Sequence, residues 1–333
     1  MKIALLGSKN FDSLEYHIGD SLTFLGHNVY HIDIKDVVKI PYRFNYWATK
    51  LFPKYDISVF LKIAGRIIDQ KPDLVICTYR FIHPSCIKLI KESLPGVPVV
   101  HINPDQLTTL EHQQIFASPY DIYFTKDHYM VNFMRKKMNL NAQYLPEALN
   151  LRVHKPLDCN RNDLEAKINT DVVAFGTMYP YRANMISELV NDGININLFG
   201  TPDRRFPKKE ITSNFKNEFI TGDRKSEVLF GSKIIFNNFH YAEIESANVK
   251  FFEIYGIGGF QICDYKEVLK EYSAIDIKDF TFKSIGEAKE MIHHYLPLTE
   301  LRHSIARRQM EHFREFHTYE IRMCEMFNHI ENI

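Results

Sequence analysis

Two glutamates eight positions apart flank residues that could bind a phosphorylated ligand. The stretch reads Glu245-Ser-Ala-Asn-Val-Lys-Phe-Phe-Glu253. If a helix begins near Ala247 or Asn248, its first N–H groups lack intrahelical acceptors and can hold a phosphate at the positive end of the helix dipole. Glu253 would then lie about one and a half turns into the helix, where its carboxylate could accept hydrogen bonds from a ribose diol. Lys250 adds a positive charge on the same helix.

The same glutamates have a plain alternative. The chain holds 41 acidic residues among 333, so this spacing can arise by chance, and solvated charges on a helix would explain the pair. The setting favours a phosphate site, because a strand-rich unit precedes the pair and the turn Gly256-Ile-Gly-Gly259 follows it. His240, which ends a strand just before Glu245, would either approach the same ligand or only terminate that strand.

In the first half of the chain, the candidate residues follow the fourth expected strand. His101 and Asp105 lie in the stretch His-Ile-Asn-Pro-Asp, at the end of a parallel strand where ligands usually bind. Asp105 could orient or deprotonate a hydroxyl group, or Asn103-Pro-Asp105 could form a turn with a helix cap. His101 could act in catalysis or be a packed histidine. Gly7-Ser-Lys-Asn10, after the first strand, could line the same side or form a plain turn.

The sequence offers no familiar pattern of metal ligands. It contains no Asp-x-Asp, no His-Glu-x-x-His and no Cys-x-x-Cys. One His-x-x-x-His spacing, His27 and His31, runs from a helix end into a strand, so it does not place both rings on one helical face. The phosphate-binding loop Gly-x4-Gly-Lys-Ser/Thr and a Gly-x-Gly-x-x-Gly after a strand are also missing. We therefore expect no metal, and positive charge for an anion would come from the protein.

Short apolar runs alternate with amphipathic segments along both halves, which predicts two α/β units with parallel sheets. The stretch Pro156–Lys167 is polar and typical of a linker between them. In the first half we expect strands at Ile3–Leu6, Val29–Ile34, Asp73–Thr78, Val99–Ile102 and Asp121–Thr125, and helices at Phe11–Leu25 and Ile57–Gln70. In the second half we expect strands at Asp171–Phe175, Ile194–Phe199, Lys233–Asn237 and Phe260–Cys263, and helices at Arg182–Asp192, Val249–Tyr255, Ile285–Tyr295 and Thr299–Glu331.

Composition and charge exclude several classes of protein. With 45% hydrophobic and 25% charged residues, the chain is neither disordered nor collagen-like nor a coiled-coil rod. Its 41 basic residues balance its 41 acidic ones, so no global field attracts nucleic acid. The five cysteines are scattered, and no apolar run is long enough for a signal peptide or a membrane span. We expect a cytoplasmic protein.

The run Ile40–Tyr55 is unusually rich in aromatic and basic residues. Aromatic rings beside cations suit a membrane interface or an acceptor-binding surface. The alternative is a helix that packs its rings into the first unit. Peripheral contact with the inner face of the membrane therefore stays open. The residues concerned are Tyr42, Arg43, Phe44, Tyr46, Trp47, Lys50, Phe52, Lys54 and Tyr55.

The second half of the chain resembles group 1 glycosyltransferases with the GT-B fold, and it is most similar to their CgeB-like, or spore-maturation, branch. The resemblance extends from about Asp171 to Phe327, whereas earlier only Tyr144-Leu-Pro146 is similar to the family's inter-domain strand. The matching motifs are the family's Glu-x7-Glu at Glu245 and Glu253, the branch's Arg-x-Phe-Glu core at Lys250-Phe-Phe-Glu253, the glycine-rich turn, strand and Asp264 behind it, and His-Thr-Tyr-x-x-Arg at His317–Arg322.

The resemblance implies an architecture of two Rossmann-like, doubly wound domains facing a central cleft. Residues 1–155 would bind the acceptor, residues 156–310 would bind a nucleotide sugar, and residues 311–333 would form a final helix returning to the first domain. Asp105 matches loosely an acidic position of the branch on the acceptor side.

The resemblance also implies roles in donor binding. Glu253 would bind the ribose hydroxyls, and Glu245 would face the donor sugar. The diphosphate would be held by the backbone of Ser246, Ala247 and Asn248. A second clamp on the phosphates would come from Gly176, Thr177 and Arg182, and His240 would lie near the donor. Lys250 stands where the branch has Arg. An ammonium, which is a point charge, therefore replaces a guanidinium that can donate two parallel hydrogen bonds.

The implied reaction is the transfer of a sugar from a nucleotide diphosphate sugar, with UDP as our guess, to a hydroxyl group. The acceptor would be a glycan, a lipid-linked molecule or a protein, as in polysaccharide biosynthesis, and the anomeric configuration would be retained. Two alternatives remain: an epimerase or hydrolase of sugar nucleotides on the same fold, and a non-catalytic nucleotide-binding protein. The sugar, the base, the acceptor and the linkage are not encoded in any residue that we recognise.

Overall fold

The computed structural model describes residues 1–105 and 114–332 and divides the chain into two compact units. The first unit comprises Met1–Pro146 together with Tyr319–Ile333, and the second comprises Glu147–Thr318. Each unit has one sheet in which all paired strands are parallel. Among the described residues, none of the helices combines the length and the apolar character that crossing a membrane requires.

The first unit contains a six-stranded parallel sheet with the order β2-β1-β3-β4-β5-β6. Because the chain moves from β1 outward to β2 and then returns to the other side of β1, the direction of winding reverses between β1 and β3. The strands are β1 (Lys2–Leu6), β2 (Asn28–Ile32), β3 (Leu74–Cys77), β4 (Val99–Asn103), β5 (Ile122–Thr125) and β6 (Ala142–Tyr144).

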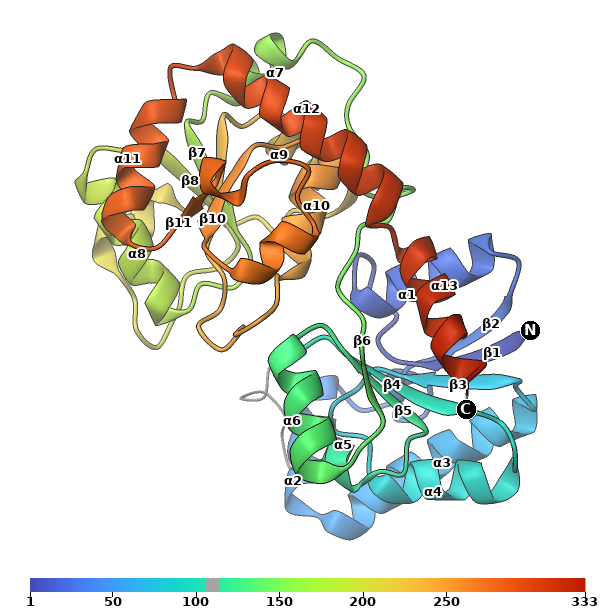
Figure 1. The fold of residues 1–333 in the computed structure, drawn as a ribbon. Helices are drawn as coiled ribbons and strands as arrows, with labels where there is room; N and C mark the ends of the chain where they lie inside the picture. The colour runs from blue at the N-terminus through green and yellow to red at the C-terminus, as the bar shows by residue number, and fades with distance from the viewer. Residues whose placement is uncertain (106–113, 333) are drawn as a thin grey trace. The chain divides into compact units, whose positions relative to one another are not determined.

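Helices cover both faces of this sheet (Figure 1). The helices α3 and α4 pack on one face, against alternate strand residues such as Val75 and Cys77. The opposite face carries α1, which packs beside α13 from the end of the chain. The helices are α1 (Leu14–Phe24), α2 (Tyr42–Leu51), α3 (Pro53–Gln70), α4 (Pro84–Ser93), α5 (Gln114–Ala117), α6 (His128–Met138) and α13 (Tyr319–Ile330).

The second unit contains a five-stranded parallel sheet with the order β11-β10-β9-β7-β8. Its winding reverses between β7 and β9, because β8 lies on one side of β7 and all later strands lie on the other. The carboxyl ends of strands beside such a reversal form a crevice where open α/β sheets bind their ligands. The strands are β7 (Val172–Phe175), β8 (Ile196–Phe199), β9 (Ile234–Asn237), β10 (Gln261–Asp264) and β11 (Thr281–Phe282).

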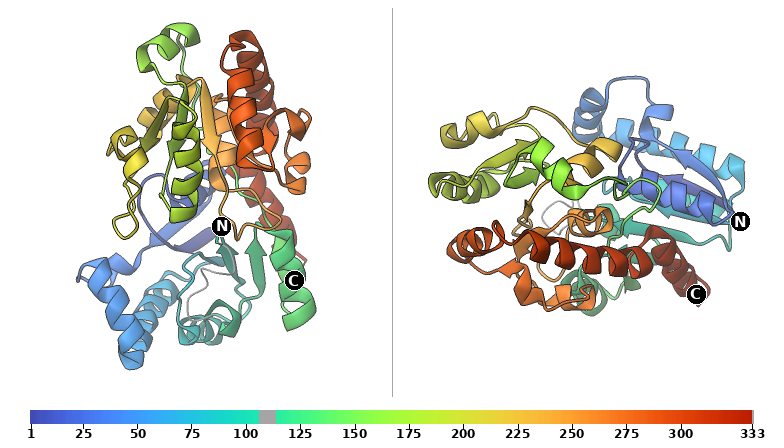
Figure 2. Two further views of the ribbon diagram at one scale, coloured as in Figure 1. Left: turned by 90° about the vertical axis from the view of Figure 1, so that its left-hand side faces the viewer. Right: turned by 90° about the horizontal axis from the view of Figure 1, so that it is seen from above.

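The strands of the second unit alternate their side chains between two apolar cores. Val172 and Ala174 face the core that contains α8 and α11, whereas Val173 and Phe175 face the core that contains α9 and α10. The turned views show helices on both sides of the sheet (Figure 2). The helices are α7 (Arg161–Ile168), α8 (Pro180–Asn191), α9 (Gly222–Phe230), α10 (Val249–Ile257), α11 (Ile285–Tyr295) and α12 (Thr299–Phe316).

Two predicted segments are wrong. The stretch Pro156–Lys167 is not simply a linker, because α7 begins at Arg161 and occupies its second half. This helix is polar because charged side chains join it to α12. Its buried Glu165 contacts Arg302 at 3.2 Å and His303 at 2.8 Å. The predicted helix Thr299–Glu331 is two helices, because the carbonyl of His317 leaves the helical pattern and accepts a hydrogen bond from the Leu149 N–H at 3.0 Å.

The aromatic and basic run forms α2 and the start of α3. The alternative in which this helix packs its rings into the first unit fails for Phe44, Trp47 and Phe52, because these three side chains are exposed. Asn45, on the other side of α2, is buried and accepts a hydrogen bond from the Tyr55 hydroxyl at 2.9 Å.

Candidate functional site

The helix α10 begins at the carboxyl edge of the second sheet, directly after the turn that follows β9. Asn248 is its N-cap, and the side-chain carbonyl accepts a hydrogen bond from the Phe251 N–H at 3.0 Å. Asn248 also exchanges hydrogen bonds with Asn237, the last residue of β9, at 3.0 and 3.3 Å. Gln261 extends this network, since it accepts from the Asn237 amide at 2.8 Å. The start of α10 is therefore tied to the sheet, and its first-turn N–H groups, which no helix can satisfy internally, have a fixed direction.

Lys250 places a positive charge at this helix start. Its Nζ lies 3.4 Å from the Phe175 carbonyl oxygen, at the end of β7, and 5.4 Å from the centre of the Phe175 ring. The pKa of Lys250 is lowered well below its usual value. The main cause is burial, which removes water from the ammonium, and the second is the positive charge of Arg182. An anion beside this ammonium would favour its charged form. Lys250 is therefore a candidate phosphate ligand.

Arg182, in α8, joins the two strands beside the reversal. Its guanidinium donates to the Phe175 and Thr177 carbonyls at 3.3 and 2.8 Å, after β7. It also donates to the side chain and the backbone of Asn238, after β9, at 2.7 and 3.1 Å. Burial lowers the pKa of Arg182, although an arginine stays charged. Four of its five N–H groups have acceptors here. Arg182 therefore mainly holds the segments after β7 and β9 together, and it also supplies a positive charge.

Gly176 and Gly200 directly follow β7 and β8 at the carboxyl edge of the second sheet. Both have positive φ angles, +98° and +132°, which favour glycine. A Cβ on Gly200 would lie 2.6 Å from the Gly176 carbonyl oxygen, too close for any other residue. The turns after β7 and β8 can therefore approach each other because residue 200 is glycine.

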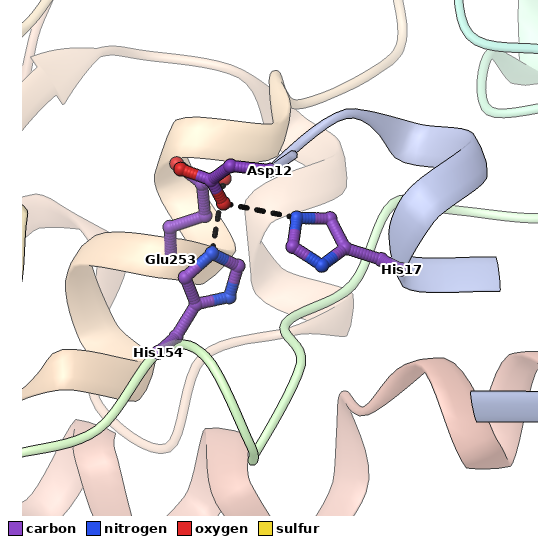
Figure 3. Close-up of side chains that lie close together, drawn as sticks. All are labelled: Asp12, His17, His154 and Glu253. Carbon is purple, nitrogen blue, oxygen red and sulfur yellow. Dashed lines mark ion pairs between the residues drawn. The ribbon is translucent and has the colours of Figure 1, made fainter. Parts of the chain in front are cut away.

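Glu253 lies in the fifth position of α10, three residues after Lys250 and hence on the same face of the helix. Its side chain is buried, and Oε1 lies 3.2 Å from Lys225 Nζ. Oε1 also lies 3.4 Å from His154 Nε2 (Figure 3). Sequence reasoning missed Lys225 and His154. Lys225 belongs to α9, a helix with no clear apolar period, and His154 lies in an irregular segment, so neither carried a signal.

Around this edge lie the other predicted residues of the second unit. Ser246 and Ala247 are buried before the helix start, whereas Glu245 is exposed in the preceding turn. His240 is half-buried, and its backbone N–H donates a hydrogen bond to the carboxylate of buried Glu243 at 3.1 Å. The structure thus brings these residues to the same sheet edge.

Asp264 ends β10 and accepts a hydrogen bond from the Phe239 N–H at 2.5 Å. Burial raises the pKa of its carboxyl to about 6. Asp264 also lines a pocket of about 200 Å³ with Tyr181, Tyr241 and Tyr265. This edge therefore combines anion-binding groups with aromatic walls.

The catalytic role predicted for His101 is not supported. His101 lies within β4 rather than beyond its end, and it is fully buried. Its Nε2 lies 3.2 Å from the Tyr79 carbonyl oxygen, and burial lowers its pKa to about 4. Such an imidazole is neutral and packed, as in the alternative interpretation of His101.

Asp105 follows β4 in a turn closed by Asn103, whose side chain accepts from the Asp105 N–H at 3.2 Å. Its carboxylate forms an ion pair with Arg80 at 2.5 Å, and both side chains are about one-third exposed. Asp105 can therefore reach a ligand. The turn of the alternative interpretation is present, and the helix that it would cap lies outside the described residues.

At the start of α1 in the first unit, Asp12 and His17 form a buried pair, with Asp12 Oδ1 3.1 Å from His17 Nε2 (Figure 3). The His17 ring stacks on Tyr319, 5.3 Å between centroids. Tyr319 belongs to the predicted His-Thr-Tyr motif, so part of that motif holds α13 against α1.

Several solved structures that are similar to this chain are glycosyltransferases with the GT-B fold. Sucrose-phosphate synthase from Thermosynechococcus elongatus has a TM-score of 0.70 at 11% identity, covering 99% of each chain. Anabaena HepE, solved with UDP and glucose, has a TM-score of 0.69 at 11% identity over 100% of both chains. T4 phage BGT, solved with its UDP-glucose substrate, has a TM-score of 0.56 at 12% identity, covering 100% of this chain and 99% of that one. The predicted α/β fold of GT-B type is thus confirmed.

A family model of glycosyltransferases matches part of the second half of the chain. Residues 182–328 match the model described as "Glycosyl transferase-like". The match includes Lys250 and Glu253 and covers less than half of the chain. No curated protein sequence matches this chain. The CgeB-like branch stays a prediction.

Proposed function

We propose that this protein is a glycosyltransferase that moves a sugar from a UDP-sugar to a hydroxyl acceptor. The observation that carries the proposal is the capped start of α10 beside Lys250, at the edge where the winding of the second sheet reverses. The family match over residues 182–328 supports the reaction class. Titles of two structural neighbours name UDP or UDP-glucose, which supports the choice of base.

The donor's diphosphate binds to the first N–H groups of α10, around Ser246, Ala247 and Asn248, and to the ammonium of Lys250. Gly176 and Thr177 contribute close backbone approach, which Arg182 holds in place. The buried carboxylate of Glu253 accepts hydrogen bonds from the ribose hydroxyls, and Lys225 Nζ lies 3.2 Å from its Oε1. Glu245 and His240 lie toward the sugar.

The positive charge that stabilises the leaving diphosphate comes, in this proposal, from Lys250, Arg182 and the helix N-terminus, without a metal. Preorganised groups of this kind can supply several kcal/mol to a transition state. Adding EDTA to the assay tests this part, because the proposed enzyme keeps its rate in the chelator.

In the proposed reaction, the acceptor oxygen forms a bond to the anomeric carbon while that carbon's bond to the diphosphate oxygen breaks. The acceptor proton passes to the departing phosphate on the same face of the sugar, so the configuration is retained. This stereochemistry rests on the resemblance to group 1 glycosyltransferases. Proton NMR of the product's anomeric signal distinguishes retention from inversion.

The first unit is proposed to bind the acceptor, a glycan, a lipid-linked molecule or a protein. Asp105, exposed beside Arg80 after β4, is the residue that we propose to orient the acceptor hydroxyl. An Asp105→Asn enzyme should keep UDP binding and lose turnover.

The decisive experiment incubates the protein with UDP-hexoses, with and without a panel of glycan and lipid-linked acceptors. UDP release that requires an acceptor, together with a glycosylated product by mass spectrometry, supports the proposal. Turnover without any acceptor would instead indicate a hydrolase or epimerase. UDP binding without any product would leave only a nucleotide-binding protein.

A further inference from the structure

The first unit carries an exposed apolar surface on and beside α2. We define the α2 surface as Ile40, Phe44, Trp47, Leu51 and Phe52. The exposed fractions of Phe44, Trp47 and Leu51 are 67%, 52% and 66%. These three lie three and four positions apart along the helix and therefore share one face. Large apolar side chains that gather in this way, rather than singly, mark an interaction surface.

The opposite side of α2 is fixed to the unit. Asn45 is buried, and it binds the hydroxyl of Tyr55 from α3 at 2.9 Å. The helix therefore presents its exposed face in one direction, and the exposed face is not simply the outside of a loose segment.

The segment that carries the α2 surface has charged side chains of one sign. Residues 39–55 contain four basic side chains and no acidic one. Lys39, Arg43 and Lys54 are exposed, and Lys50 lies 4.3 Å from the centre of the Tyr46 ring. The chain as a whole is neutral, so this local excess of positive charge is a property of the α2 surface.

We propose that the α2 surface binds an anionic lipid membrane, with α2 lying in the plane of the interface. Its apolar face would enter the boundary between headgroups and acyl chains, and its basic residues would contact lipid phosphates. A neutral glycan could stack on exposed aromatic rings but would gain nothing from four cations. The combination of apolar side chains with uniform positive charge therefore favours anionic lipid. This inference does not depend on the proposed glycosyl transfer.

The chain provides its own probe, because Trp47 is its only tryptophan. We propose titrating the full chain with vesicles of phosphatidylcholine containing 30% phosphatidylglycerol, and with pure phosphatidylcholine vesicles. Insertion of the α2 surface shifts Trp47 emission to the blue and protects it from acrylamide, with anionic vesicles only. Sedimentation with the vesicles measures the same binding independently.

Two variants that keep Trp47 test the two contributions to membrane binding, which are the positive charge and the apolar side chains. Each basic residue near a charged surface is worth about 1 kcal/mol, or about fivefold in affinity, so Arg43→Gln/Lys54→Gln should weaken binding about 25-fold. Phe44→Ser should weaken it about tenfold through lost apolar burial. Arg307→Gln/Arg308→Gln and Phe219→Ser change exposed residues of the second unit and should leave vesicle binding unchanged.

Three results would overturn the proposal. One is the absence of any Trp47 shift and sedimentation with anionic vesicles while the protein's melting temperature is normal. Another is equal weakening by the variants of the second unit. The third is a Trp47 shift with soluble polysaccharide, or with rising protein concentration alone, but not with vesicles. UDP binding is measured in parallel, so that failure of membrane binding and failure of the proposed function are separate results.

Discussion

Replacing Lys250 by methionine should separate nucleotide binding from folding. The ammonium has one long hydrogen bond, 3.4 Å to the Phe175 carbonyl oxygen, and its pKa is held well below the usual value. Removing it should therefore leave the free energy of unfolding of the apo protein equal to or above that of the wild type. A charge-assisted hydrogen bond is worth about 1.5–3 kcal/mol, and unit charges 4 Å apart interact by about 4 kcal/mol near a protein surface. We expect a loss of about 2–4 kcal/mol in UDP binding, which is about 30-fold to 1,000-fold in Kd.

Calorimetric titration with UDP and thermal melting of the apo protein measure the two effects. Lys233→Met is the matched control, because Lys233 precedes β9 at the opposite edge of the same sheet and pairs with Asp171. The control should bind UDP normally and lose at most about 1 kcal/mol of stability. UDP affinity within twofold of wild type in Lys250→Met, or an unfolded apo variant, would refute the reasoning.

Proton linkage gives the same prediction a second readout. The pKa of Lys250 is lowered in the free protein, and a bound diphosphate would raise it. UDP binding should therefore take up a proton at pH values between the lowered and the raised pKa, and affinity should fall as pH rises through that window. Titrations in buffers of different ionisation enthalpy count this proton, and Lys250→Met should abolish it.

Three other predictions concern the framework of the site. Glu253→Gln removes the carboxylate that lies 3.2 Å from the ammonium of buried Lys225 and should cost about 3–5 kcal/mol of stability; adding Lys225→Met should restore stability but not UDP affinity, as melting and titration would show. Burial raises the pKa of Asp264 from 3.8 to about 6, which corresponds to about 3 kcal/mol. The ionised carboxylate therefore destabilises the folded state fully above pH 6, and this destabilisation is absent below pH 4. Asp264→Asn should accordingly match the wild type at pH 4 and be more stable by up to about 3 kcal/mol at pH 7 in urea unfolding; equal gains at both pH values would contradict this. Gly200→Ala should cost about 2 kcal/mol or more and weaken UDP binding, whereas Gly193→Ala, which meets no atom within 4 Å, should cost only about 1 kcal/mol and leave binding intact.

The strands were the most predictable part of the fold. Parallel strands are covered on both faces, so they appear as short apolar runs, and β1, β3, β7 and β9 lie within one or two residues of the expected bounds. The two-residue strand β11 was too short to give any pattern.

Helices were predicted where one face is apolar, and missed elsewhere. In α9 the large apolar residues are confined to the C-terminal turn, and α7 is held by the charges around Glu165. Neither helix has an apolar stripe to reveal it. The break between α12 and α13 was missed because its cause, the hydrogen bond from Leu149 to the His317 carbonyl, joins residues far apart in the sequence.

The candidate site was predictable only where it is local. Asn248 caps the helix within the predicted range, because capping depends on neighbouring residues. The partners of Glu253 come from distant segments, so no spacing could have indicated Lys225 or His154. His101 lies within the expected strand Val99–Ile102 and within β4, which continues to Asn103, but the pattern of a strand does not show that this side chain is fully buried.

The most direct test of the central claim is a crystal structure of the protein with UDP. The account predicts the diphosphate within hydrogen-bonding distance of the first N–H groups of α10 and of Lys250 Nζ, with the ribose at Glu253. Phosphates bound elsewhere, or bound only through a divalent cation on carboxylates, would contradict it.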